Sequence, residues 1–476
     1  MSKTDILPST SSPVEPSKGS TILGASLNFV NCIVGAGCIG YGGAIAQSGG
    51  MISLTTMLLF AILAKLSFDL LIGLSIETGS ITTSYEDLGE MAWGRKGRLS
   101  VLWSKLVFSY GALVAIAVIV KDNFAPACRM LLGLPGLSQD DQVRDWTLIF
   151  YKDNLLTFLL CLSAMLPICF LRDMHPLERF SAIKIMAFAM IITTVIYLFL
   201  TLRIEPTPGQ LPTNPNKAFV THWLEVRPGF IQNMGTYIFT FVAQHTCHLV
   251  YRSLKPELRN LDGWKKVSTY GLAMSTVLSL PVGLFAYLTY WEQTDSNLFL
   301  FYPPSFPLYI SRLLLCVAML LSYPMPFFST RELIIIALPK PSKMALMLRK
   351  TSGYGRETDS LLKINHNTGQ EIASTSWMIP GEDRQLTRPY HAALTVLLWG
   401  TSIFLALAAP SLGDVLNLMG CLTGTIIAFI LPALFSFQIH GYTHVAAILL
   451  AIGSVVGCIG TYYSVADLVH DLQKRN

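Results

Sequence analysis

Two asparagines and two glycines share one face of the first long apolar run of this sequence. Gly24, Asn28, Asn31 and Gly35 stand at positions i, i+4, i+7 and i+11, which is the spacing of one helix face. Amide side chains are costly in hydrocarbon unless they meet a cavity or another helix. The face therefore predicts either a binding surface or a packing seam of small residues, and both readings remain open.

A cluster of glycines follows directly on this face. Its members are Gly35, Gly37, Gly40, Gly42 and Gly43. Glycine weakens a helix, and a broken helix presents N–H groups that hold a carboxylate and carbonyl groups that hold a cation. Residues 35–40 also spell GxGxxG, but this stretch lies inside an apolar run and no ribose-binding acid follows, so a dinucleotide site is not indicated.

The sixth apolar run carries two histidines. Phe241, His245, His248 and Arg252 would share one face of a continuous helix. Because histidine titrates near about pH 6.5, His245 and His248 are candidates for substrate binding or proton coupling. Packing histidines with satisfied hydrogen bonds are the alternative.

Three further runs contain polar groups. In the eighth, Ser322 precedes Pro324 and Pro326, which free backbone carbonyls, so the segment predicts either a cation ligand or a simple kink. The tenth repeats the spacing of the first and is read mainly as close helix packing; its residues are Gly413, Asn417, Gly420 and Gly424. Lys65 and Asp69 are expected to neutralise each other, and Asp122 is expected at a solvated helix end.

The composition sets the class of protein. Hydrophobic residues make up 52% of the 476 residues and charged residues only 13%, too few to cover several water-soluble domains. The net charge of +5 is scattered, so nucleic acid is not an expected partner. The nine cysteines have no CxxC spacing, and no enzyme motif is found. We expect no enzyme, no cofactor, no disulfide framework and no metal beyond a coupling Na⁺.

The apolar runs predict an all-α polytopic membrane protein with eleven transmembrane helices. The expected spans are 22–47, 51–76, 99–120, 155–171, 180–202, 230–250, 267–290, 308–338, 389–409, 412–437 and 442–466. Residues 1–21 are expected to be a disordered tail, 22–466 the transporter domain, 339–388 a loop within it and 467–476 a C-terminal tail. Most of the 34 Lys and Arg residues, Lys184 among them, flank the spans on the N-terminal side of the membrane. This bias places the N-terminus and the 339–388 loop in the cytosol.

Several segments together resemble the amino acid/auxin permease superfamily, in particular neutral amino acid transporters and fungal vacuolar amino acid transporters. They are residues 28–40 (NFVNCIVGAGCIG), 84–98 (SYEDLGEMAWGRKGR), 166–181, 239–254 and 322–331, together with TGTIIAFILP in the tenth run. The resemblance implies two inverted repeats of five helices, as in the bacterial leucine transporter fold, and alternating access. It also implies that the sixth span unwinds near His245, although no Gly or Pro marks a break there.

The resemblance assigns roles to individual residues. The cation-coupling positions are Asn31, Val34 and Ser322. The substrate-binding positions are Gly35, Ala36, Gly37, Tyr41, Phe241 and His245. Where relatives commonly carry Pro and an aromatic residue, this chain has Tyr41, Gly42 and Gly43, which predicts a more flexible half-helix.

The expected function is secondary active transport of amino acids, with neutral ones favoured, coupled to Na⁺ or H⁺. The expected setting is the vacuolar, endolysosomal or plasma membrane. One alternative is an amino acid sensor that signals through a cytosolic regulator bound at the 339–388 loop. Another is a passive facilitator, which would show no cation dependence.

Overall fold

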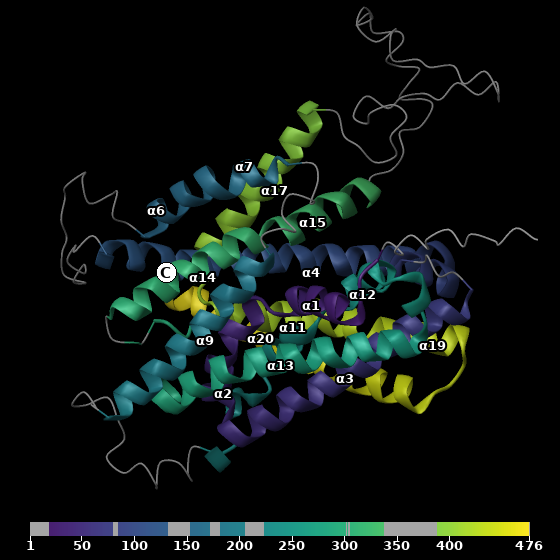
Figure 1. The fold of residues 1–476 in the computed structure, drawn as a ribbon, viewed down its shortest axis with the longest axis horizontal. Helices are drawn as coiled ribbons and strands as arrows, with labels where there is room; N and C mark the ends of the chain where they lie inside the picture. The colour runs from purple at the N-terminus through teal and green to yellow at the C-terminus, as the bar shows by residue number, and fades with distance from the viewer. Residues whose placement is uncertain are drawn as a thin grey trace, which may run out of the picture.

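A computed structural model describes residues 19–79, 84–131, 153–171, 181–204, 223–300, 302, 305–337 and 388–475. Nearly all of the predicted N-terminal tail (1–21) and of the predicted 339–388 loop lies outside these residues, so the expected regulator site lies outside them too. Within the described residues the chain is helical, with one isolated β-bridge between Ser20 and Leu254 (Figure 1).

The helices follow the apolar runs closely. In chain order they are α1 (Ile22–Ile33), α2 (Ala36–Ser48), α3 (Gly50–Glu77), α4 (Tyr85–Leu131), α6 (Asp153–Leu160), η1 (Cys161–Met165), α7 (Leu166–Cys169), α9 (Ser181–Ile204), α11 (Met234–Phe241), α12 (Gln244–Ser253), α13 (Leu261–Tyr290), α14 (Phe306–Ser322), α15 (Pro324–Ala337), α17 (Arg388–Ala408), α18 (Leu412–Met419), η6 (Gly420–Gly424), η7 (Ile426–Ile430), α19 (Leu431–Ile439) and α20 (His444–Arg475). Short 3₁₀ turns lie at Pro228–Phe230, Pro256–Leu258 and Trp291–Gln293.

Length and hydropathy qualify eight of the described helices as membrane spans. The pair α1 and α2, bent by 57°, makes a ninth. Two predicted spans are less regular: 155–171 holds a short apolar helix, Thr157–Cys169, and 230–250 is divided between α11 and α12. The membrane class is confirmed, whereas the count of eleven stays a prediction.

Two predicted boundaries differ from the structure. Helix α4 begins at Tyr85 rather than near Leu99, and it is interrupted at Trp93 and Gly94, where Gly94 has a φ of 59°. Helix α20 runs on to Arg475, so most of the predicted C-terminal tail (467–476) is helical. Polar residues at both places hid the helix from a search for apolar runs.

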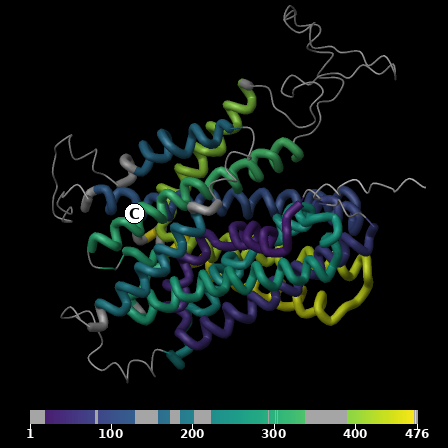
Figure 2. The backbone as a smooth tube through the Cα atoms, in the orientation of Figure 1, coloured from purple at the N-terminus to yellow at the C-terminus, as the bar shows by residue number. Residues whose placement is uncertain are grey.

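The broken helices lie at the centre of the bundle. Figures 1 and 2 show α1 and α11 between α4 on one side and α3 with α13 on the other. Helix α13 packs against α1, α2, α3 and α9, and α14 packs against α4 and α9. Large apolar side chains such as Val277, Phe404 and Tyr462 are exposed on outer helices, as lipid contact requires.

Two predictions concern polar residues away from the centre of the bundle. One is confirmed and the other is not. Lys65 and Asp69 do form an ion pair, with 2.6 Å between Nζ and Oδ2. The prediction of a solvated end at Asp122 is wrong. Its side chain is mostly buried, and Asn297 Nδ2 donates to Asp122 Oδ2 over 3.4 Å. Lys121 Nζ donates to the carbonyls of Ala406 and Ala409, each 3.1 Å away, so the end of α4 is bonded to neighbouring segments.

The tenth run packs closely against α11, as predicted. A Cβ on Gly420 would lie 2.8 Å from the Cα of Gly235, so neither glycine has room for a side chain. Asn417 Oδ1 accepts hydrogen bonds from the backbone N–H and the hydroxyl of Thr236, over 2.9 and 2.7 Å. Asn417 therefore ties α18 to α11.

Candidate functional site

The first span breaks between α1 and α2. The last helical hydrogen bond of α1 runs from Val34 N–H to the Val30 carbonyl, and α2 begins at Ala36. In a continuous helix the Asn31 carbonyl would accept from the N–H of Gly35. The break therefore frees carbonyls at the end of α1 and N–H groups at the start of α2.

A second break lies between α11 and α12. Helix α11 ends at Phe241 and α12 begins at Gln244, with Val242 and Ala243 in non-helical conformations. The unwinding near His245 that the family resemblance implied is therefore present. Neither residue of the break is glycine or proline; the Gln244 side chain instead accepts from the Ala243 N–H over 3.1 Å. This side chain replaces one of the lost helical hydrogen bonds.

The two breaks face each other. Helix α1 packs against α12, and α2 packs against α11. Helices α2 and α11 approach each other closely at Gly37, where a Cβ would lie 2.7 Å from the Cα of Thr240. Gly35 differs, because a Cβ there would meet nothing within 4 Å. Free space thus begins at Gly35, between the two breaks.

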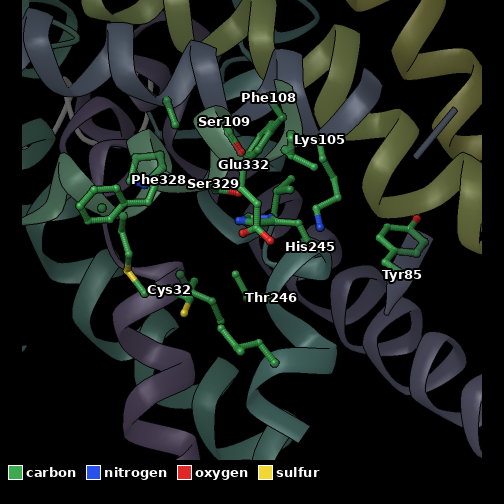
Figure 3. A pocket seen from close by; sticks show the side chains of 18 of the residues that line it. Cys32, Tyr85, Lys105, Phe108, Ser109, His245, Thr246, Phe328, Ser329 and Glu332 are labelled. Atoms are coloured by element: carbon green, nitrogen blue, oxygen red, sulfur yellow. The ribbon is translucent and has the colours of Figure 1, made fainter. Parts of the chain in front are cut away.

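A cavity of about 560 Å³ occupies this space. It is lined by eight of the predicted substrate-binding, cation-coupling or proton-linked residues: Asn31, Val34, Gly35, Ala36, Gly37, His245, His248 and Ser322. The lining continues to Arg252 and Glu332, whose side chains are exposed, so the cavity reaches the protein surface. Figure 3 shows side chains extending into it from α4, α12 and α15, among them Lys105, His245 and Glu332. The volume is within the range of small-molecule sites.

Two predicted substrate contacts do not line the cavity. Tyr41 is buried on α2, where its ring packs edge-on against Tyr237 at a centroid distance of 5.7 Å. Phe241 is also buried, and the break that follows it removes it from the helix face of His245. Their roles as substrate contacts stay predictions that this cavity does not support. Phe239 and Val242 line the cavity from this segment instead.

The two histidines differ in their surroundings. His248 Nε2 lies 2.8 Å from Ser75 Oγ, and its ring stacks on Tyr85. The His245 ring packs against Phe108 at 5.5 Å between centroids, and its Nδ1 has no hydrogen-bond partner among the described residues. The Nδ1 of His248 also has no partner among the described residues, so the two histidines differ in that the His248 ring is held by the contact with Ser75. His248 therefore resembles a packing histidine more than His245 does.

Ser322 and one of the two first-span asparagines line the cavity. Ser322 lines the cavity, and its hydroxyl donates to the Ala318 carbonyl over 2.7 Å, so its oxygen can still accept or coordinate. Asn31 lines the cavity, but Asn28 is exposed and does not. Only half of the predicted polar face therefore reaches the site.

Several charged residues that line the cavity were not predicted, and three of them are bonded within its wall. Lys105 and Glu86, both on α4, form an ion pair with 2.5 Å between Nζ and Oε1, and both side chains are mostly buried in the cavity wall. Lys184 on α9 donates from Nζ to the Asn31 carbonyl over 2.8 Å. Its position beside an apolar run signalled only membrane topology, and no pattern in the sequence points to α1.

The chain is similar in sequence to known membrane transporters. A family described as transmembrane amino acid transporter protein matches residues 18–469. "Putative sodium-coupled neutral amino acid transporter 11" of Mus musculus is 23% identical over 451 residues, covering 93% of this chain and 84% of its own. "Sodium-coupled neutral amino acid symporter 2" of Danio rerio is 22% identical over 444 residues, covering 89% and 77%. These names describe membrane transporters rather than enzymes.

Proposed function

Because the chain belongs to the transmembrane amino acid transporter protein family, we propose that it is a secondary active transporter of neutral amino acids. It works by alternating access and couples transport to a cation, Na⁺ or H⁺. The observation that carries this proposal is the pair of facing helix breaks that open onto one cavity. Transporters use such breaks to hold substrate and coupling ion near the middle of the membrane.

The first break offers complementary groups for both ends of an amino acid. The carboxylate binds at the N-terminal end of α2, where the N–H groups of Gly35, Ala36 and Gly37 lie at the positive end of the helix. The amino group binds carbonyls freed at the end of α1. His245 contributes its unpartnered Nδ1. The apolar lining from Phe239 and Val242 suits an uncharged side chain.

The coupling cation binds beside the substrate. Asn31 and Val34 lie at the negative end of α1, and the Ser322 oxygen faces the same cavity. His245 and His248 are the proton-linked candidates, with His245 favoured because His248 is bonded to Ser75. A cation bound there would favour one of the alternating conformations over the other.

The orientation follows from the charge bias. With the N-terminus in the cytosol, the cavity reaches the cytosolic face, because Ser20 pairs with Leu254 two residues beyond the exposed cavity residue Arg252. On this proposal the molecule is in an inward-open state of an eleven-span bundle with five-helix repeats. The opposite end of the first span, at Gly43, packs against Ser296 and must separate in the outward-open state.

The test is uptake into proteoliposomes that contain the purified protein. A panel of radiolabelled amino acids is assayed with sodium and pH gradients imposed separately. We expect saturable accumulation of neutral amino acids under at least one gradient. Uptake that never exceeds that of empty vesicles, or that never accumulates substrate against its gradient, would contradict the proposal.

Asn31 and Asn28 supply a matched pair for the cation site. We expect Asn31→Ala to lower gradient-driven uptake about tenfold, since one ligand beside a charged group is lost. Asn28→Ala on the same helix serves as the control, because Asn28 does not line the cavity. Equal uptake by the two variants would remove Asn31 from the mechanism.

A further inference from the structure

Helix α4 begins as a hairpin rather than as a straight span. The backbone leaves the helical conformation at Trp93 and Gly94, which separate a short first arm from a long second arm. The two arms are in direct contact, since a Cβ on Gly89 would lie 2.8 Å from the carbonyl oxygen of Gly97. The bend therefore forms a tip, residues 91–96, at one end of a membrane span.

Two ion pairs hold the arms of the hairpin together. Near the tip, Arg98 Nη1 lies 2.7 Å from Glu90 Oε2. Further along, Lys105 Nζ lies 2.5 Å from Glu86 Oε1, and both of these side chains form part of the cavity wall, where Figure 3 shows Lys105. The hairpin is thus a built element that connects the tip to the cavity.

Two basic residues of the tip have no such partner. Arg95 and Lys96 are exposed, and neither forms an ion pair or a side-chain hydrogen bond with a described residue. The tip contains no acidic residue, and Glu90 beside it is already paired with Arg98. Two uncompensated positive charges therefore lie side by side at the end of the span.

An exposed apolar stripe continues from the tip along the second arm. Leu99, Trp103 and Val107 follow Lys96 at i+3, i+7 and i+11, so the four residues share one helix face. All three apolar side chains are exposed, Trp103 by 57%. The stripe lies on a helix that is long and apolar enough to span a membrane, so its surroundings are lipid.

The order of groups on this face matches the order of groups in one leaflet of a bilayer. Lysine and arginine attract anionic headgroups, tryptophan favours the interface, and aliphatic side chains favour the acyl chains. Lys96 and Val107 are separated by about 16 Å along the helix, which is close to the thickness of half a bilayer core. A small soluble anion would match only the charged tip and would leave the stripe unexplained.

We propose that the tip and the stripe of α4 bind an anionic phospholipid. Its phosphate lies at Arg95 and Lys96, and its acyl chains lie along Leu99, Trp103 and Val107. With the N-terminus in the cytosol, this lipid belongs to the cytosolic leaflet. Because the same hairpin carries part of the cavity wall, the bound lipid stabilises that wall. The inference requires a membrane-embedded protein but not the proposed transport activity.

The test follows tryptophan fluorescence of the purified full-length protein in lipid nanodiscs. Brominated acyl chains quench a tryptophan that they contact. At equal mole fraction, we expect brominated phosphatidylserine to quench more than brominated phosphatidylcholine. Trp103→Phe should remove this excess, because Trp103 lies on the stripe.

A double substitution, Arg95→Gln with Lys96→Gln, tests the headgroup contact. It should lower the preference for phosphatidylserine about 25-fold, since each basic residue beside an anionic surface contributes about fivefold. Neither residue has a described partner, so the fold should be retained. Lys265→Gln with Lys266→Gln is the matched control, because these lysines are also adjacent and exposed, near the start of α13. The control should keep the preference.

Several results would overturn the inference. Equal quenching by the two brominated lipids, or an unchanged preference in the Arg95 and Lys96 variant, would remove the site. An equal loss in the control would show an effect of general surface charge, and loss of the preference in millimolar inorganic phosphate would indicate a site for free anions. If Trp103→Phe changes quenching by neither lipid, protein such as a second copy covers the face. Failure of transport would leave all of these binding results unchanged.

Discussion

The two halves of the first span differ in glycine content and in their surroundings: α1 contains one glycine and α2 contains four. Helix α1 ends in open space, where a Cβ on Gly35 would meet nothing within 4 Å. Helix α2 is buried along nearly its whole length. A Cβ on Gly42 would lie 3.2 Å from Thr294 Cγ2, and one on Gly43 would lie 2.6 Å from Ser296 Cα.

The contrast explains what the glycines of α2 do. The sequence Tyr41, Gly42 and Gly43 predicted a flexible half-helix, but residues 36–48 form one uninterrupted helix. The glycines do not interrupt the helix, and its greater flexibility stays a prediction. The missing side chains allow the backbone of α2 to approach its neighbours closely, which seals the end of the cavity opposite to its opening. Only Gly35 coincides with the break itself.

Substitution in the sealed half should have the largest effect on stability. Gly43→Ala places a Cβ against backbone atoms of Ser296, which cannot shift as a flexible side chain can. We expect a loss of about 1–3 kcal/mol, measured as a lower thermal midpoint of the purified protein. Gly35→Ala is the control and should change the midpoint little. If both variants melt alike, the packing contrast between the two halves is not real.

Substitution of the two cavity histidines should have different effects on transport. His245→Ala removes a cavity histidine whose ring has no hydrogen bond to a described residue such as the one His248 has with Ser75, so we expect uptake to fall about tenfold. His248→Ala breaks the contact with Ser75 and should lower stability more than substrate affinity. For each variant we would measure uptake as a function of substrate concentration and the thermal midpoint of unfolding. A larger loss of affinity in His248→Ala would reverse the assignment.

The smallest effect on stability and uptake is expected at Lys65, which does not line the cavity. Lys65→Met removes one partner of an ion pair whose side chains are partly exposed. We expect a change within about 1 kcal/mol and uptake close to that of the wild type. The check is a thermal midpoint and one uptake curve. Strongly reduced uptake would show that α3 takes part in the transport cycle beyond its packing role.

Local signals in the sequence predicted a good part of the fold and the site. Apolar runs identified most helices, because the bilayer core requires about 20 apolar residues per span. Asn31 and Gly35 were found because an amide and a glycine on one face are unusual in hydrocarbon. Both residues line the cavity.

Other features depended on contacts between distant segments. The break at Val242 and Ala243 carries no Gly or Pro, and Gln244 partly compensates it, so composition did not reveal it. A helical wheel drawn through that break assigned Phe241 to the wrong face. Lys184 looked like any basic residue beside a span, and its bond to Asn31 joins residues 153 positions apart.

Uptake by the wild-type protein in proteoliposomes tests the central claim most directly. A neutral amino acid is supplied outside, a sodium gradient and a proton gradient are imposed in separate experiments, and internal substrate is followed with time. The account predicts accumulation above the external concentration under at least one gradient, which an ionophore that collapses this gradient abolishes. Equilibration without accumulation under every imposed gradient would contradict it.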